Sequence, residues 1–467
     1  MATISSAGVG SGLDVNSIIT QLMAIEQKPL TVLQTKETTL QSTVSEYGKI
    51  KSAISTMRDL AAKLASTSTW SQTVANSSNS AVGAASNNSA AGTYSVEVQA
   101  LASTQTVAMG TAVAATTTPG AGTLRIELGT WGNNQKSFTP QPGATAVDVS
   151  IASTDTLADV RDKVNAAGAG VTALIMTDAS GSRLVFRSNL SGAGNAFRTS
   201  GISSLTFDPS KGGSKLVQTQ TAADAAATIN GLAVTSSSNT LTNVVDGLTL
   251  NLNAMTTAPV TVNVVTDTEA LKKTITEFAA AYTAVVQLIA TDTKYDPVSK
   301  KGGLLQGDSA AVGLQRQLRN LAGSLSGAST VFPRLSDAGL QLQADGSMTV
   351  NATRLDAALA NVAELKKAFS ASSLTDPSLD GFGKRFRVVT DAMLGIDGAL
   401  TTRTDGLGKQ LQRNQKDQDA LEARLEGIEK RYRAQYTALD AAMAKLTSQS
   451  GYITQQIAAW TANSSNR

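Results

Sequence analysis

The clearest signal in this chain is a change in the period of its hydrophobic residues from one region to the next. Near the N-terminus they alternate at spacings of three and four, which is typical of a helix in a coiled coil or a bundle. A short stripe of Ile18, Leu22 and Ile25 comes first, and Pro29 is expected to end or kink that helix. The longer stripe that follows consists of Leu40, Val44, Tyr47, Ile50, Ile54, Met57, Ala61 and Leu64.

The C-terminal region carries the stronger helical signal, a heptad pattern that runs from residue 407 to residue 460. Seven of the eight positions in its first line are apolar, which predicts a long coiled-coil helix. This line consists of Leu411, Gln418, Leu425, Tyr432, Leu439, Leu446, Ile453 and Trp460. The second line consists of Leu407, Leu421, Ile428 and Ala442, with Asn414, Gln435 and Gln449 as polar interruptions.

Between about residues 75 and 265 the period changes to two, which predicts half-buried strands, mostly antiparallel. Examples are the alternating segments 94–98, 124–128, 248–252 and 260–264. One helix is expected inside this region, since Thr156 and Asp159 form a capping pattern and Gly168 ends the run. The Ser/Asn-rich segment 76–92 is predicted to be a linker or a mobile loop.

Helical periodicity returns after residue 268. Apolar faces predict a helix over 275–289, a second over 312–321 and a third that runs through Leu355 and Phe369. Between the second and the third, Ala344-Asp345-Gly346 predicts the turn of a hairpin.

These patterns predict an α+β multidomain fold whose chain runs out through one terminus and returns through the other. Its terminal helices would form a coiled-coil stalk (1–40 and 405–467), followed by an α-rich bundle domain (41–75 and 266–404). Inserted beyond it would be two antiparallel β-rich head domains, a proximal one (76–107 and 222–265) and a distal one (108–221). Two other arrangements stay open at this point, in which the terminal heptads pair with other subunits or fold separately.

Composition narrows the range of functions. The chain has no Cys and no His, which removes zinc sites built from those ligands, His-dependent catalytic triads and disulfides. A net charge of +3 is too small for general binding to nucleic acid. No apolar stretch is long enough to predict membrane insertion, and the first residues lack the pattern of a cleaved signal peptide. We therefore expect a protein that either stays inside the cell or leaves without losing a leader.

No convincing catalytic, cofactor or metal site emerges from the motifs. Gly8-Val9-Gly10-Ser11-Gly12 lacks the strand and the Lys-Ser/Thr of a phosphate-binding loop. Asp292 and Asp296 do not have the spacing of an EF-hand, and Asp155, Asp159 and Asp162 are explained by helix capping. We therefore expect a protein that is not an enzyme.

Three stretches follow one another in a characteristic order. Gly8, Gly10, Gly12, Leu13 and Asp14 form an N-terminal signature before the break at Pro29. The stretch from Asp224 to Leu250 resembles the Ile-Asn repeat of flagellar axial proteins, and the third stretch is Gly303-Leu304-Leu305-Gln306-Gly307-Asp308. Together they resemble the flagellar filament cap family, hook-associated protein 2, whose C-terminal domain the third stretch is similar to. Residues 108–221 match no motif, and in this family that region is the variable one.

The resemblance implies a secreted ring at the distal tip of the flagellum that retains exported flagellin and promotes its folding and insertion during elongation. A pentamer is favoured over a tetramer or hexamer. Implied partners are flagellin, the hook–filament junction protein, the export apparatus, a cap-specific export chaperone at the C-terminal helix and, as an optional adhesive role, host mucin. The alternatives are a flagellin-like or junction subunit, or a coiled-coil surface adhesin.

The resemblance also implies site residues. The N-terminal signature would serve export, and the helical seam would anchor the ring to the filament. This expected seam comprises Leu411, Leu421, Leu425, Ile428, Tyr432, Leu439, Leu446, Ile453, Trp460, Leu40, Val44, Tyr47 and Ile54.

Overall fold

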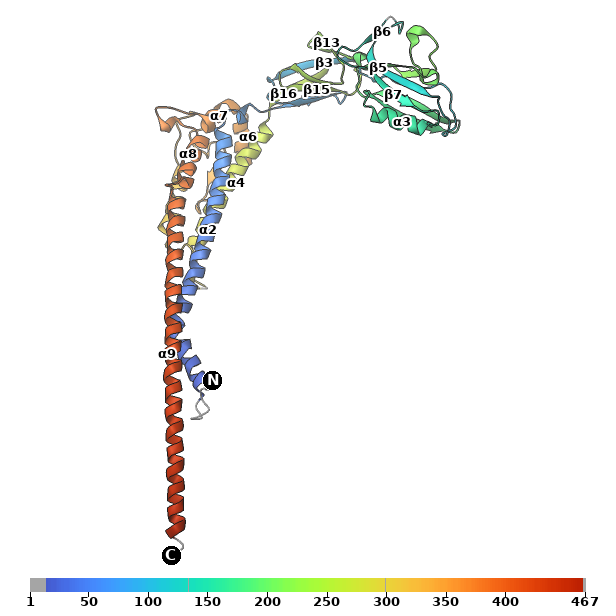
Figure 1. Ribbon diagram of the computed structural model, residues 1–467. Helices are drawn as coiled ribbons and strands as arrows, with labels where there is room; N and C mark the ends of the chain where they lie inside the picture. Colours follow the sequence, from blue (N-terminus) through green and yellow to red (C-terminus); the bar gives the residue numbers. More distant parts are fainter. Residues whose placement is uncertain (1–13, 133, 299, 465–467) are drawn as a thin grey trace. The chain divides into compact units, whose positions relative to one another are not determined.

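The computed structural model describes residues 14–132, 134–298 and 300–464. Contacts divide the chain into two compact units, a helical one made of the segments up to Thr69 and from Thr268 onward, and a β-rich one over Trp70–Asp267 (Figure 1). The β-rich unit is thus inserted between the two halves of the helical unit. The prediction of terminal helices around inserted antiparallel β structure is confirmed.

The helical unit is a bundle from which one long helix continues (Figure 1). Its helices are α1 (Val15–Glu26), α2 (Lys28–Ala65), α4 (Thr268–Thr293), α5 (Ser309–Ala322), α6 (Ala352–Leu359), α7 (Val362–Ser370), α8 (Phe382–Leu394) and α9 (Ala399–Ser464). Two short hairpins, β17 (Tyr295–Asp296) with β18 (Lys301–Gly302) and β19 (Leu340–Leu342) with β20 (Met348–Val350), connect them.

The core of the bundle forms where α2, α4 and α8 meet. Phe386 of α8 packs edge-on against Phe278 and Tyr282 of α4, with ring centroids 5.0 and 6.0 Å apart. From α2, the predicted stripe residues Tyr47, Ile50 and others down to Leu64 are fully buried. Among the described helices, α4 alone is long and apolar enough to span a membrane. Because eight of its side chains are buried in the bundle, core packing accounts for its hydropathy.

Pro29 lies in the first turn of α2, directly after α1 ends. It therefore separates two helices, as predicted, because Pro is tolerated at a helix start but not inside a helix. The predicted stripe of α1 is wrong by one position. Val15, Ile19 and Met23 are buried, while Ile25 is 61% exposed.

The predicted single helix through Leu355 and Phe369 is two helices, α6 and α7. Asn361 interrupts it, and its side chain accepts a hydrogen bond from the backbone N–H of Glu364 at the start of α7. A new N-terminal cap therefore begins a second helix within one apolar pattern.

The β-rich unit holds two sheet assemblies, and every strand pair in it that the structure describes is antiparallel. The first consists of a five-stranded and a three-stranded sheet that share one core, and the second of two four-stranded sheets with helix α3 (Leu157–Ala166). The strands of the first are β1 (Thr73–Ser77), β2 (Val82–Ser86), β3 (Gly92–Ala100), β12 (Ala225–Ile229), β13 (Leu232–Ser236), β14 (Thr240–Val245), β15 (Leu248–Leu252) and β16 (Val260–Thr266). Those of the second are β4 (Thr106–Met109), β5 (Gly122–Gly132), β6 (Ser137–Pro140), β7 (Val147–Ile151), β8 (Val171–Asp178), β9 (Gly181–Ser188), β10 (Ala196–Ser200) and β11 (Leu216–Gln220).

The capping signal predicted in this unit is confirmed. Thr156 and Asp159 form the predicted capping box at the start of α3. Asn230 and Gly231 both have positive φ and turn β12 into β13, as expected of an Asn-Gly hairpin.

The predicted linker over 76–92 is wrong. That segment contains the end of β1, all of β2 and the start of β3, and these strands pair with β16 and β15 far along the chain. The division into four domains stays a prediction. Its boundaries after residues 40 and 404 fall inside the continuous helices α2 and α9, and the boundary after residue 75 falls inside β1.

Candidate assembly surface on the C-terminal helix

Helix α9 continues without a break for 66 residues, and its seam divides into two halves with different surroundings. In the first half, Leu407, Leu425 and Ile428 are at most 6% exposed, and Leu425 and Ile428 pack against the chain's own N-terminal helix α1. Leu425 and Ile428 contact Val15, Ile19 and Met23 of α1. This half of the predicted seam is an intramolecular coil, in which the two ends of the chain run antiparallel (Figure 1).

Two polar seam positions fix the register of this coil. The buried Asn414 donates from Nδ2 to the carbonyl oxygen of Leu33 at 3.0 Å. Gln418 donates to a carboxylate oxygen of Glu37 at 2.8 Å. A buried amide that must meet its partner disfavours any sliding of α9 along α2.

A buried ion pair holds the start of α9 to the bundle. Arg403 donates to Asp308, with Nη2 2.7 Å from Oδ2, and Asp308 also caps α5. Burial opposes ionisation of this carboxyl, yet the adjacent hydroxyl of Tyr47 and the guanidinium of Arg403 lower the pKa of Asp308. The carboxylate therefore stays charged and links three helices, since Tyr47 comes from α2.

The remaining N-terminal residues of the expected site have separate places. Leu40, Tyr47 and Ile54 are buried and Val44 is half-buried. Asp14 caps α1, and its Oδ1 accepts from the backbone N–H of Ser17 at 3.0 Å. Gly8, Gly10, Gly12 and Leu13 lie outside the described residues.

The second half of the α9 seam is exposed. Its apolar side chains, which we call the tip stripe, have between 39% and 80% of their area exposed. They recur at spacings of three, four or seven residues along one face. The tip stripe consists of Leu439, Met443, Leu446, Ile453, Ile457 and Trp460.

The apolar positions after Ile428 differ from the second line of the predicted seam. They are Tyr436, Met443 and Ile457, one residue further along than the line through Gln435, Ala442 and Gln449. Tyr436 still packs on the α1 cluster. Two successive steps of four residues, from Ile428 to Tyr432 and on to Tyr436, cause this shift, and such steps unwind a coil locally.

Charge also changes at this point of α9. Twelve of the 25 residues from 409 to 433 are charged, but only two of the 31 residues from 434 to 464 are. A solvent-exposed helix normally carries charge on the face opposite its apolar stripe. The segment 434–464 therefore differs in composition from an ordinary solvent-exposed helix.

The three carboxylates Asp155, Asp159 and Asp162 have structural partners, whereas the buried Oδ2 of Asp292 has none among the described atoms, and burial raises the pKa of Asp292. Asp155 accepts from the backbone N–H of Ala152 at 2.7 Å and pairs with Lys163. The hydrogen bond from Lys163 lowers the pKa of Asp155. Within the described ranges, no group of three or more Asp or Glu side chains is arranged to hold a metal ion.

Comparison with known proteins gives the family. A family model described as the flagellar hook-associated protein 2 C-terminus matches residues 222–448, and the corresponding N-terminus model matches residues 11–105. The flagellar hook-associated protein 2 of Escherichia coli strain K12 is 31% identical over 482 residues, covering 98% of each chain. The chain belongs to the flagellar hook-associated protein 2 family.

Other relatives agree with this family. The B-type flagellar hook-associated protein 2 of Pseudomonas aeruginosa is 29% identical over 97% of each chain. A crystal structure of the D1-D2-D3 domains of the flagellar cap protein FliD from Escherichia coli superimposes with a TM-score of 0.58 and 28% identity, covering 78% of this chain and 99% of that one.

One part of the sequence interpretation is wrong. The sequence predicts no motif in residues 108–221, but the model of the flagellin hook IN motif matches residues 132–189. The Ile-Asn repeat between Asp224 and Leu250 stays a prediction. The matched segment contains β6 to β9 and α3, in the sheet assembly that we expect to be variable.

Proposed function

We propose that this chain is a flagellar filament cap subunit, located at the distal tip of the extracellular filament. There it retains exported flagellin and promotes its folding and insertion. Membership of the hook-associated protein 2 family across 98% of the chain supports a cap over a flagellin-like subunit, a junction subunit or an unrelated adhesin.

The tip stripe is the observation that carries the anchoring role. It extends the seam beyond the part that α1 and α2 cover, on the segment 434–464 of α9, which has only two charged residues. We propose that assembly buries it, so that Leu439, Leu446, Ile453 and Trp460 hold the cap to the filament end. In this proposal Leu411, Leu421, Leu425, Ile428 and Tyr432 act indirectly, because they fold α9 against the chain's own N-terminal helices.

The number of subunits in the ring and the individual binding partners are proposals as well. The ring would be a pentamer in preference to a tetramer or hexamer. The hook–filament junction protein would receive the first ring, and the N-terminal signature would direct export. An uncovered tip stripe would also need a chaperone before assembly, because exposed apolar helices associate non-specifically. We further propose that the chain has no catalytic role, since Asp155 and Asp159 are held by a helix cap and an ion pair and the family is a structural one.

The test is reconstitution with the full chain. Purified protein is added to filaments that lack a cap, together with flagellin monomers, and filament length is followed by electron microscopy. We expect elongation only when the chain is present, and native mass spectrometry of the same sample should give a closed ring. Filaments that grow equally without the chain, or a chain that never occupies their ends, would refute the cap function.

A further inference from the structure

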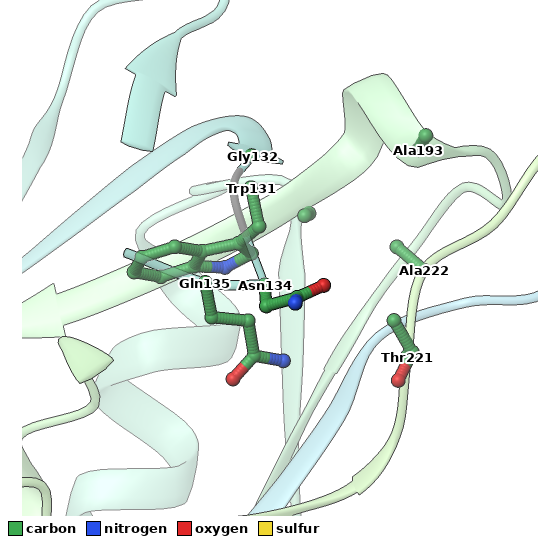
Figure 2. Close-up of a pocket in the computed structure, with 8 residues that line it drawn as sticks. Trp131, Gly132, Asn134, Gln135, Ala193, Thr221 and Ala222 are labelled. Atoms are coloured by element: carbon green, nitrogen blue, oxygen red, sulfur yellow. The ribbon is translucent and has the colours of Figure 1, made fainter. Parts of the chain in front are cut away.

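The β-rich unit contains a cavity of about 400 Å³ beside the end of β5. Figure 2 shows its two walls. Trp131, Asn134 and Gln135 lie on one side, and Ala193, Thr221 and Ala222 lie opposite. The assembly surface on α9 belongs to the other unit of the chain, so this cavity is a separate feature.

The aromatic wall of the cavity is fixed in place. The indole Nε1–H of Trp131 donates to the carbonyl oxygen of Phe197 at 3.2 Å. The ring also packs against Phe138, with centroids 4.7 Å apart, and edge-on against Phe207 at 5.8 Å. A ring held on several sides presents a preformed surface at little entropic cost.

The polar wall has an unusual backbone. Asn134 and Gln135 both have positive φ, 53° and 68°, a conformation that is uncommon for residues other than glycine. Such residues concentrate at functional sites, where the surrounding structure holds them. Gln135 donates a side-chain hydrogen bond to Gln218, whose own Nε2 is buried and has no partner among the described atoms.

The chemistry of the walls selects a class of ligand. None of the described lining residues is charged, so nothing compensates the desolvation of an ionic ligand. The side chains offer one aromatic ring, two carboxamides and one hydroxyl, which together donate to and accept from alcohol groups. We propose that this cavity binds an uncharged sugar ring, with its C–H face on Trp131 and its hydroxyl groups on Asn134, Gln135 and Thr221.

The volume fits one small ligand, since binding pockets of about 300–1,000 Å³ are typical of small molecules. A single sugar ring makes few contacts, so we expect a Kd on the order of 1–10 mM. The inference does not depend on the cap function, and sugar binding is measured on the isolated chain.

The experiment uses the indole signals of the ¹⁵N-labelled full chain, which has three tryptophans. The probes are the methyl glycosides of glucose and galactose, N-acetylglucosamine and N-acetylgalactosamine, each titrated to 50 mM. We expect the signal of Trp131, assigned with Trp131→Phe, to shift saturably with at least one probe. The signals of Trp70 and Trp460 should stay in place.

Variants test the polar wall without removing the indole. Asn134→Ala and Thr221→Val should each weaken binding at least threefold. Asn88→Ala is the matched control, because Asn88 also has positive φ (58°) but is exposed outside the cavity, and it should bind like the parent. The proposal fails if no probe shifts the Trp131 signal, or if both wall variants bind like the parent. A Trp131 signal that moves with protein concentration and not with sugar would assign the cavity to contacts between copies, which also overturns the proposal.

Discussion

Removing two leucines from the tip stripe should detach the cap from the filament while the chain itself stays folded. The change is Leu439→Ala together with Leu446→Ala. In the single chain these side chains are 46% and 59% exposed, so about half of each remains to be buried on assembly.

The expected loss of binding free energy follows from the half of each leucine side chain that assembly would bury. Full burial of a leucine is worth about 1.5–3 kcal/mol, so assembly gains about 0.8–1.5 kcal/mol from each side chain. The double variant should therefore lose about 1.5–3 kcal/mol of attachment per subunit, or roughly 12- to 140-fold in affinity at tenfold per 1.4 kcal/mol. A ring multiplies this loss over its subunits, because each contributes one α9.

The assay measures capping directly. Purified variant is added to uncapped filaments with flagellin, which avoids any effect of the substitutions on export. We expect at least tenfold fewer occupied ends than with the parent, and little elongation. Cells that produce the variant should release flagellin monomers into the medium and carry few or short filaments.

A matched control separates the stripe from exposed leucine in general. Leu325→Ala with Leu374→Ala removes two leucines from the bundle surface that are 59% and 102% exposed, and this variant should cap like the parent. The circular dichroism spectra of both double variants should match that of the parent. If the stripe variant occupies filament ends as the parent does, the tip stripe is not the anchor.

Four further predictions concern the rest of the chain. Asn414→Leu should raise the free energy of unfolding, measured by chemical denaturation, by about 1 kcal/mol, because it removes a buried Oδ1 that lacks a hydrogen-bond partner among the described atoms. Crosslinking should at the same time reveal a looser register between α9 and α2. A loss of stability would contradict this prediction. Asp308 has a lowered pKa, so its contribution to stability is present above the usual carboxyl range and is lost as pH falls through the folded-state pKa. The difference in thermal midpoint between the parent and Asp308→Asn should therefore shrink from pH 7 to pH 2, and a constant difference would rule the ion pair out as its source. Replacing residues 105–220 by a short Gly-Ser linker should leave the proximal sheets folded, because Ser103 and Ala223 already form a β-bridge, and a lost cooperative melting transition would refute this. Amide hydrogen exchange should be at least tenfold slower over 407–428 than over 439–460 in the isolated chain, because only the first segment is packed, and equal rates would contradict the division of the seam.

Local sequence signals determined the type and the approximate position of most elements. Strict alternation marked the half-buried strands, and Thr156 with Asp159 marked the start of α3. Pro29 separated α1 from α2 because its ring excludes it from a helix interior. Asn361 and Glu364 carry a similar capping signal, but the apolar pattern continues across it and by itself predicts one helix.

Only the tertiary structure decided which partner each apolar face meets. Helix α1 has apolar residues on two adjacent faces, and its contact with Leu425 and Ile428 selects Val15, Ile19 and Met23 for burial. Segment 76–92 becomes strand because β15 and β16, more than 150 residues away, supply its hydrogen bonds. The cavity at Trp131 also depends on contacts between distant segments, since the end of β5 forms one wall and residues near Ala193 and after β11 form the other. The spacing of hydrophobic residues predicts that one face of a helix or strand will be buried. Which segment covers that face depends on contacts between distant parts of the chain, and these are specified only by the tertiary structure.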